Sequence, residues 1–454
     1  MTRRTLFFEM ALLPEGWASD VVVSIEKGMI VSVAAGAPYE GQPRIAGAAL
    51  PGLPNLHSHA FQRGMAGLAE RRGPSGDSFW TWREVMYRFL ERLDPDDVQA
   101  IAAMAMMEML EGGFTSLAEF HYLHHGPDGR PYSDRAELSA RIAAAAAETG
   151  IGLTLLPVLY AQGGFGSQPA RPGQRRFLNG IDDYLALHEG ARKAVAALPY
   201  GTIGTAPHSL RAVAPETLRA LVDAKLPGPV HIHVAEQVKE VEDCLAWSGQ
   251  RPVEWLLSHV AVDARWCLVH ATHMEPSEVT ALARSGAVAG LCPITEANLG
   301  DGFFEGVAFE AAGGRYGVGS DSNVEISAPH ELRWLEYGLR LKHRGRNIMQ
   351  TREGGSTGEA LYGAALAGGA QALAQPVGSI AVGKRADFVV LDTRHPTLAT
   401  MAPSQWLDAY VFVAGQAAID QVIVGGDNVV ERGRHRRRDM IAARFVRTME
   451  RVLQ

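Results

Sequence analysis

The sequence predicts an α/β protein, a (β/α)8 TIM barrel with a small flanking β-sandwich built from both chain ends. This prediction depends on eight apolar strand candidates that alternate with helical segments, and on β-rich segments at the two ends of the chain. The strand candidates, in chain order, are "AALPGLPNLHSH", "TSLAEFHY", "GLTLLPVLY", "GTIGTAPHS", "PVHIHVAE", "RWCLVHATH", "AVAGLCPIT" and "YGVGSDSN".

Length and composition agree with an enzyme-sized soluble protein. The 454 residues can bury a large core, and 47% hydrophobic with 20% charged residues is usual for a globular chain. The net charge of −7 argues against nucleic acid or an acidic membrane as a general partner. No uninterrupted apolar segment has the length that crosses a bilayer, so we expect no membrane partner.

The chain ends have the texture of short antiparallel strands. "DVVVSIEKGMIVSVAA" near the start, and "GSIAVGKRADFVVLD" and "IDQVIVGGDNVVERG" near the end, combine β-type runs with Gly turns. We expect a β-sandwich domain from residues 1–50 and 375–432, the catalytic barrel over 51–374, and a helical tail over 433–454. Glu9 interrupts the apolar run in "MTRRTLFFEMALLPEGW", which predicts a strand there rather than a signal peptide.

Other local patterns are simpler to interpret. "DPDDVQAIAAMAMMEMLEGG" begins with an Asp-Pro helix start and ends in a Gly pair, so it predicts a helix. The basic tail "ERGRHRRRDM" on an acidic chain predicts a solvated surface cluster rather than a nucleic-acid site. Three cysteines, Cys244, Cys267 and Cys292, form no CxxC pair and leave an odd thiol, which favours a reducing, cytoplasmic location.

Polar residues gather at the C-terminal ends of the predicted strands. In a barrel these ends converge on one face, where the active sites of this fold lie. The polar residues at the strand ends are His57, His59, His121, Tyr122, His208, His233, His270 and Asp321.

Four of these residues predict a metal site. Side chains at i and i+2 of a strand point to the same side, so His57 and His59 can reach one ion together, with His233 and Asp321 from later strands. Three imidazoles and a carboxylate suit Zn²⁺, although Fe(II) or Mn(II) could occupy similar ligands. His231 lies one strand repeat deeper than His233, and we expect it to be a packed residue.

The same face carries groups for proton transfer. Glu236 lies three residues beyond His233 in the turn after the strand, and His270 closes the sixth strand. A metal, a water, a carboxylate and a further imidazole are the parts of a hydrolytic site. In this interpretation Asp321 accepts a proton from water, His270 holds the water in line, and Glu236 carries a proton to a leaving nitrogen.

These motifs together resemble the amidohydrolase superfamily, whose members are metal-dependent (β/α)8 barrels. The resemblance covers nearly the whole chain and includes "PGLPNLHSH", "HVAE", "VHATH", "GSDS" and "GSIAVGKRADFVVLD". The fourth strand candidate, "GTIGTAPHS", lacks the lysine that bridges two metals in binuclear members. The resemblance therefore implies one divalent ion, a deaminase-type reaction at a C=N bond, and a homodimer.

Further segments resemble the members that convert N-formimino-L-glutamate and water to N-formyl-L-glutamate and ammonia in histidine degradation. These segments are "NLHSHAFQRGMAGLAE", "FWTWREVMY", "EFHYLHH", "APHSLRAV" and "CPITEANLGDG". The resemblance implies a small dicarboxylate substrate whose carboxylates pair with Arg83 and Arg211, because guanidinium groups bind carboxylates bidentately. It implies that Gln62, Tyr122 and His208 hold the remaining polar atoms. An ordinary surface salt bridge of Arg83 with Glu84 or Glu111 is the alternative.

Two other functions stay open at this point. A one-metal deaminase of a purine or triazine-type ring would need aromatic stacking partners, for which Trp80, Trp82 and Phe61 are available. A non-catalytic scaffold should have lost ligands or proton-transfer groups, and this sequence keeps all of them. The Gly/Pro-rich loop over residues 161–177 is either a lid or a mobile surface loop.

Overall fold

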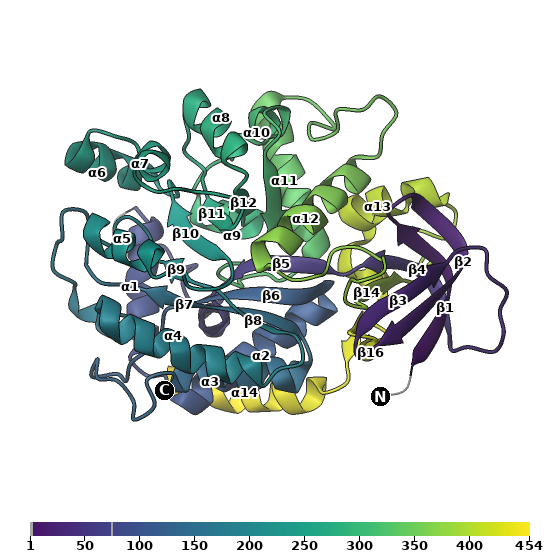
Figure 1. Cartoon of the computed structure of the whole chain (residues 1–454), viewed down its shortest axis with the longest axis horizontal. Helices are drawn as coiled ribbons and strands as arrows, with labels where there is room; N and C mark the ends of the chain where they lie inside the picture. The colour runs from purple at the N-terminus through teal and green to yellow at the C-terminus, as the bar shows by residue number, and fades with distance from the viewer. Residues whose placement is uncertain (1–2, 74–75) are drawn as a thin grey trace.

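The computed structural model describes residues 3–73 and 76–454, and strands from both ends of the chain meet in one eight-stranded sheet. Figure 1 shows the N-terminal strands, in purple, beside the yellow C-terminal ones at one side of the barrel. Phe8 and Phe388, from opposite ends of the chain, pack with ring centroids 4.7 Å apart. The sheet runs in the order β17 (Arg434–His435), β16 (Asp427–Glu431), β15 (Ile419–Val424), β14 (Phe388–Leu391), β4 (Arg44–Pro51), β1 (Arg4–Leu13), β2 (Gly16–Glu26) and β3 (Met29–Ala34).

The predicted central strands form a closed parallel barrel. Two runs of parallel strands are joined by the bridges Thr205↔Val230 and Ser209↔His233, and the bridge Ser58↔Asp321 closes the circle. The strands are β5 (Leu53–Ser58), β6 (Phe114–His121), β7 (Gly152–Leu159), β8 (Gly201–Ile203), β9 (Ala206–Pro207), β10 (Val230–Val234), β11 (Trp266–His270), β12 (Val288–Leu291) and β13 (Arg315–Val318).

Two strand expectations need correction. The first candidate, "AALPGLPNLHSH", spans two strands: its first residues end β4 in the flanking sheet, and Leu53 begins β5 in the barrel. Gly52 lies at this change of sheet, and a β-carbon there would lie 2.2 Å from Thr115 Oγ1, so the close approach requires glycine. The fourth candidate is divided into β8 and β9, which both pair with β7.

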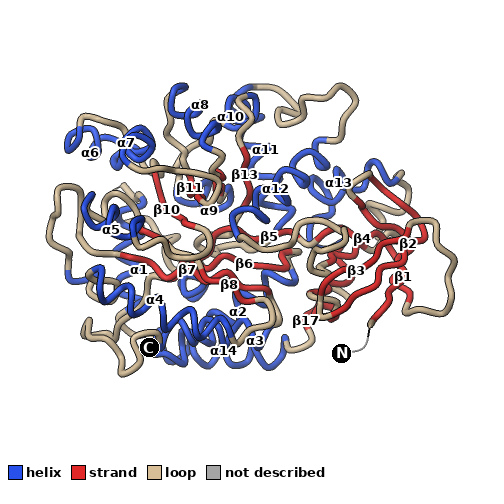
Figure 2. Tube along the Cα trace, viewed as in Figure 1, coloured by secondary structure: helices blue, strands red, loops and turns tan. Residues whose placement is uncertain are grey.

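Helices surround the barrel strands (Figure 2). The predicted helix after the first barrel strand is confirmed as α2, with Asp94 as N-cap, Pro95 in the first turn and Gly112 as C-cap. The helices are α1 (Phe79–Leu90), α2 (Pro95–Glu111), α3 (Glu137–Thr149), α4 (Ile181–Ala196), α5 (Pro215–Asp223), α6 (Val238–Ser248), α7 (Pro252–His259), α8 (Pro276–Ser285), α9 (Pro293–Leu299), α10 (Gly306–Ala311), α11 (Ala328–His343), α12 (Thr357–Leu373), α13 (Trp406–Ala409) and α14 (Arg438–Leu453).

The basic C-terminal segment packs against the barrel through α14, which lies along α2. Arg438 pairs with Glu111, and Arg434 pairs with Asp439 within the segment itself. Arg432 and Arg436 are exposed, as expected for a solvated cluster. In the described parts of the chain, no helix is both long and apolar enough to cross a membrane.

Candidate active site

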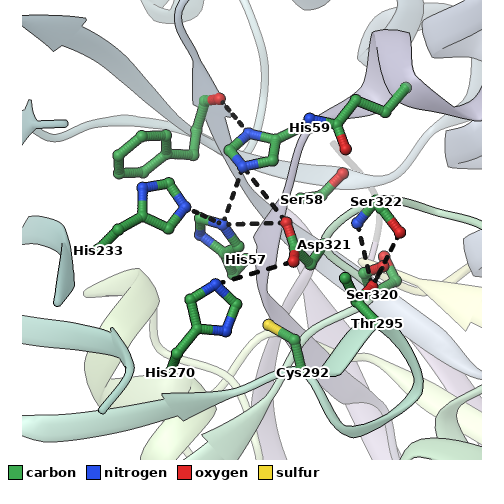
Figure 3. Close-up of polar contacts among 12 residues, drawn as sticks. His57, Ser58, His59, His233, His270, Cys292, Thr295, Ser320, Asp321 and Ser322 are labelled. Carbon is green, nitrogen blue, oxygen red and sulfur yellow. Dashed lines mark hydrogen bonds and ion pairs between the residues drawn. The ribbon is translucent and has the colours of Figure 1, made fainter. Parts of the chain in front are cut away.

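A cavity opens at the C-terminal ends of the barrel strands, the face on which the active sites of this fold lie. The structure brings ten of the eleven predicted site residues to the cavity lining, and these are His59, Gln62, Arg83, Tyr122, His208, Arg211, His233, Glu236, His270 and Asp321. The eleventh, His57, is fully buried and belongs to the histidine cluster beside the cavity (Figure 3).

The predicted metal ligands form one tight group. One donor atom from each of His57, His59, His233 and Asp321 lies within 4.8 Å of the others. Nε2 of His57 is 3.3 Å from Nε2 of His59 and 3.1 Å from Nε2 of His233. Asp321 Oδ1 completes the group, 3.5 Å from His57 Nε2 and 3.3 Å from His59 Nε2.

The tautomers of the histidines fit a cation. Nδ1 of His59 lies 2.9 Å from the carbonyl oxygen of Phe120, and Nδ1 of His233 lies 3.1 Å from that of His208. A carbonyl oxygen only accepts hydrogen bonds, so each Nδ1 carries the proton and each Nε2 turns a lone pair toward the other donors. Such convergent lone pairs around a carboxylate suit a divalent metal ion and repel one another without one.

The charges of the group lead to the same conclusion. Burial lowers the pKa of His57 to about 3, and burial also lowers the pKa values of His59 and His233, so the rings are neutral near pH 7. Burial opposes ionisation of Asp321, but the imidazoles of His57, His59 and His270 around it hold the pKa of Asp321 below its ordinary value. Neutral rings and an ionised carboxylate are the protonation states that metal binding requires.

The backbone fixes Asp321 at the meeting of the first and last barrel strands. Its N–H donates to the carbonyl of His57 (3.0 Å), and its carbonyl accepts from the N–H of His59 (2.9 Å). Asp321 has a left-handed φ of +42°, which costs free energy for a residue with a β-carbon. Asn323 stabilises this turn, because its side-chain amide donates to Ser58 Oγ and to the carbonyls of His59 and Asp321.

The two predicted proton-transfer residues lie beside this group. His270 Nε2 is 3.8 Å from Glu236 Oε1 and 3.9 Å from Asp321 Oδ2. Burial raises the pKa of Glu236 to about 7, against the opposing charges of His270 and Arg211. Burial alone would lower the pKa of His270, but Glu236, Glu296 and Asp321 together raise it to about 10. The arrangement places two groups that can exchange protons beside Asp321.

Two arginines bring positive charge to the same cavity. Arg211 Nη2 lies 3.8 Å from Glu236 Oε2, and Arg211 Nε lies 3.9 Å from Glu240 Oε2. Both guanidinium groups lie over the ring of Trp80, at 4.6 Å for Arg83 and 5.8 Å for Arg211. Nε of each arginine has no hydrogen-bond partner among the described residues. The ion pairs of those residues include none between Arg83 and Glu84 or Glu111, and Glu111 pairs with Arg438 instead.

The remaining predicted residues form the polar part of the lining. Gln62 Nε2 donates to Tyr122 Oη (2.8 Å), and the Tyr122 hydroxyl lies 3.2 Å from the sulfur of Met86. Within the described chain, Gln62 Oε1 is buried without a partner. His208 Nδ1 lies 3.1 Å from Ser209 Oγ. An accepting oxygen and an imidazole thus remain available for a polar ligand.

Some residues differ from the expectation. His121 is buried with both ring nitrogens unpaired among the described residues, and unlike Tyr122 it does not line the cavity. His231 donates to the carbonyl of Ala372 (2.8 Å) and is a packed residue, as expected. The sequence interpretation missed Glu240, whose oxygens accept the backbone N–H groups of Ala235 and Glu236, both at 3.2 Å. It also missed Glu296, which lies in the first turn of α9.

Comparisons with known proteins agree with this geometry. A model of the amidohydrolase family matches residues 48–429, and the chain belongs to that family. A second model, described as "Formimidoylglutamate deiminase HutF, N-terminal domain", matches residues 3–44. The formimidoylglutamate deiminase of Pseudomonas aeruginosa is 54% identical over 450 residues, which is 99% of each chain.

Two more relatives place the chain within the family. An 8-oxoguanine deaminase of Pseudomonas aeruginosa is 28% identical over 386 residues, covering 83% of this chain and 81% of the relative. The crystal structure of an amidohydrolase from Brucella melitensis superposes with a TM-score of 0.95 at 50% identity, covering 99% of this chain and 100% of that one. The barrel and the sheet from both chain ends are therefore features of the family fold.

Proposed function

We propose that this protein hydrolyses N-formimino-L-glutamate to N-formyl-L-glutamate and ammonia, a reaction of histidine degradation. The observation that carries the proposal is that Arg83 and Arg211 line the same cavity as the candidate metal ligands. The substrate has two carboxylates and an amidine, so it matches a cavity with two guanidinium groups beside a hydrolytic centre. The identity of 54% to the Pseudomonas aeruginosa deiminase supports the same reaction.

The two neighbouring guanidinium groups of Arg83 and Arg211 would be stabilised by an anionic ligand. Two cations near one aromatic ring repel, and the buried Nε of each arginine makes no hydrogen bond with any described residue. A buried polar group without a hydrogen bond costs free energy, which an anionic ligand would recover. We assign the substrate carboxylates to Arg83 and Arg211, and its remaining polar atoms to Gln62, Tyr122 and His208.

The reacting end of the substrate would lie between Asp321, His270 and Glu236. When bound to His57, His59, His233 and Asp321, a divalent ion supplies Lewis-acid chemistry that lets water ionise near neutral pH. Asp321 Oδ2, on the side of His270, takes a proton from the attacking water, and His270 holds that water in line. Glu236 delivers a proton to the amidine nitrogen, so that a C–O bond forms, a C–N bond breaks and ammonia leaves.

We propose Zn²⁺ as the ion. Neutral imidazoles with one carboxylate are a borderline donor set, which zinc prefers over the hard, oxygen-binding ions. The short distances between donor atoms support a single ion rather than two.

A ring deaminase remains the alternative function, because Phe79 and Trp82 line the cavity and could stack on a purine or triazine. Two of the aromatic side chains that this alternative would use are occupied elsewhere. Trp80 lies against the two arginines, and Phe61 is buried against Tyr122 with ring centroids 5.1 Å apart. This favours the dicarboxylate substrate.

An ammonia-release assay tests the function. We expect release from N-formimino-L-glutamate, loss of release after chelation, and recovery when zinc is returned. Guanine and S-adenosylhomocysteine serve as ring substrates in the same assay. Ammonia from the ring compounds alone would reject the proposal in favour of the alternative.

We also propose that the protein is a cytoplasmic homodimer. Cys244, Cys267 and Cys292 are free and buried, which supports a reducing compartment. Trp334 and Leu341 of α11 expose 45% and 73% of their surface, and such apolar exposure supports self-association. Light scattering of the purified protein should give twice the mass of one chain, and the mass of a single chain would contradict the dimer.

A further inference from the structure

Glu296 lies directly behind His270 and is not used by the mechanism above. It belongs to the first turn of α9, which follows barrel strand β12, and its side chain is buried. Its carboxylate oxygen Oε1 accepts the backbone N–H of Cys292 at 2.9 Å. Nδ1 of His270 lies 3.2 Å from that same oxygen. One oxygen therefore joins the end of β12 to the imidazole.

The two nitrogens of His270 face different surroundings. Nδ1 faces Glu296, whereas Nε2 faces Glu236 Oε1 at 3.8 Å and Asp321 Oδ2 at 3.9 Å. Since Glu296 is not among the residues that line the cavity, a ligand there would meet the Nε2 side of the ring. A hydrogen bond at Nδ1 thus decides which way Nε2 points and which nitrogen carries the proton.

The strained backbone at His270 makes the hydrogen bond between Glu296 and His270 Nδ1 more important. His270 and Ala271 have left-handed φ values of +69° and +47°, an arrangement that costs free energy for non-glycine residues. The ring therefore stands on a strained turn at the end of β11. A fixed partner in the first turn of α9 compensates for a backbone that does not by itself hold the side chain in one orientation.

We propose that Glu296 is a positioning residue for the reaction, which holds the Nδ1–H of His270 in a hydrogen bond and so keeps Nε2 turned toward Glu236 and Asp321. The oxygen that does this is fixed by the N–H of Cys292, which can only donate. Thr295, the residue before Glu296, holds the other side of the site: its hydroxyl lies 3.0 Å from Ser322 Oγ, next to Asp321 (Figure 3). The kinetic test of this role rests on the proposed function, because it measures turnover of N-formimino-L-glutamate.

Three substitutions separate the geometry of Glu296 from its charge. Glu296→Gln removes the charge, but the Cys292 N–H places the amide oxygen at Oε1, where it still accepts from His270 Nδ1. Glu296→Asp keeps the charge but is one methylene too short to reach both donors. Glu296→Ala removes both.

We expect Glu296→Gln to retain kcat within about five-fold, and Glu296→Asp and Glu296→Ala to lose about 10²-fold or more, with KM little changed in all three. Exposed Glu242 on α6 supplies the control, and Glu242→Ala should match the wild type. Normal kcat in the Asp variant, or equal losses in the Gln and Asp variants, would overturn the positioning role.

A second readout needs no substrate. ¹⁵N spectra of the histidine rings, recorded on zinc-loaded protein, should show a hydrogen-bonded Nδ1–H for His270 in the wild type and in Glu296→Gln, but loss of that hydrogen-bonded signal in Glu296→Asp. The His270 signal is assigned by its absence in His270→Asn. An unchanged signal in Glu296→Asp would reject the proposal. If the wild-type protein released no ammonia from N-formimino-L-glutamate, the proposed function would fail while this spectral test still decided the role of Glu296.

Discussion

Arg211 Nη2 lies 3.8 Å from Glu236 Oε2, so the group assigned to a substrate carboxylate adjoins the group assigned to proton delivery. Glu240 contacts both neighbours, through an ion pair to Arg211 Nε at 3.9 Å and a hydrogen bond from the Glu236 N–H at 3.2 Å. Substrate recognition and chemistry therefore share one connected set of charges, and substitutions at its members should have different kinetic effects.

Replacing Arg211 should weaken substrate binding. We expect Arg211→Met to lower kcat/KM by about 10- to 150-fold, mainly through KM, because a hydrogen bond to a charged group contributes about 1.5–3 kcal/mol. Steady-state ammonia release measures this, with Arg219→Met on the exposed face of α5 as the matched control. Equal kinetics of the two variants would remove Arg211 from the binding site.

Replacing Glu236 should slow the chemical step instead. Glu236→Gln keeps the shape of the side chain but cannot deliver a proton, so kcat should fall by about 10²- to 10⁴-fold with little change in KM. The exposed Glu242→Gln is the control. Near-wild-type turnover in Glu236→Gln would mean that another group protonates the leaving nitrogen.

Metal removal should lower stability as well as activity. The neutral imidazoles of His57, His59 and His233 face one another at short range, so an ion among them stabilises only the folded chain. When zinc is added to metal-free protein at about 100 times its Kd, the free energy of unfolding should increase by about 2.7 kcal/mol. The measurement is the rise in Tm on adding zinc. Magnesium, which prefers oxygen ligands, should give little change. Asp321→Asn should reduce the zinc effect, and an equal rise in that variant would contradict the ligand set.

Glu119 should make stability depend on pH. Its carboxylate is fully buried on β6 and accepts the N–H of Ala60 at 2.7 Å, and burial raises the pKa of Glu119 from 4.5 to about 8. The folded chain therefore binds a proton that the unfolded chain releases, and the free energy of unfolding falls as pH rises from 4.5 through about 8. Glu119→Gln should lose this dependence. As pH rises from 5 to 8, the Tm of the wild type should therefore fall relative to the Tm of the variant. A constant Tm difference across those pH values would show that Glu119 does not titrate in this way.

Much of the site could be predicted because, in a barrel, residues at the C-terminal ends of the strands come together on one face. His57, His233 and Asp321 meet because each lies at the C-terminal end of a parallel strand, and strand periodicity finds such positions. The preference for a dicarboxylate depended on resemblance, since no spacing rule identifies Arg83 as a cavity residue rather than a surface one. The division of the chain at residues 50, 374 and 432 stays a prediction, and the loop over residues 161–177 keeps its two alternatives, a lid or a mobile surface loop.

The missed features depend on contacts that leave no periodic signal. An acidic residue in the first turn of a helix, as at Glu296, is ordinarily explained by the helix dipole. Glu296 has another role only because His270, at the end of β11, lies next to it in the folded chain. The division of the fourth strand likewise depends on the different stretches of β7 that Gly201–Ile203 and Ala206–Pro207 pair with.

The bridge between Ser58 and Asp321 closes the barrel and joins residues more than half the chain apart. During synthesis on the ribosome, His57 and His59 emerge early, but their carboxylate partner is added only after the last barrel strand. A growing polypeptide therefore carries histidines with no complete ion-binding centre, and hydrolytic capability arises only when the circle of strands has been completed.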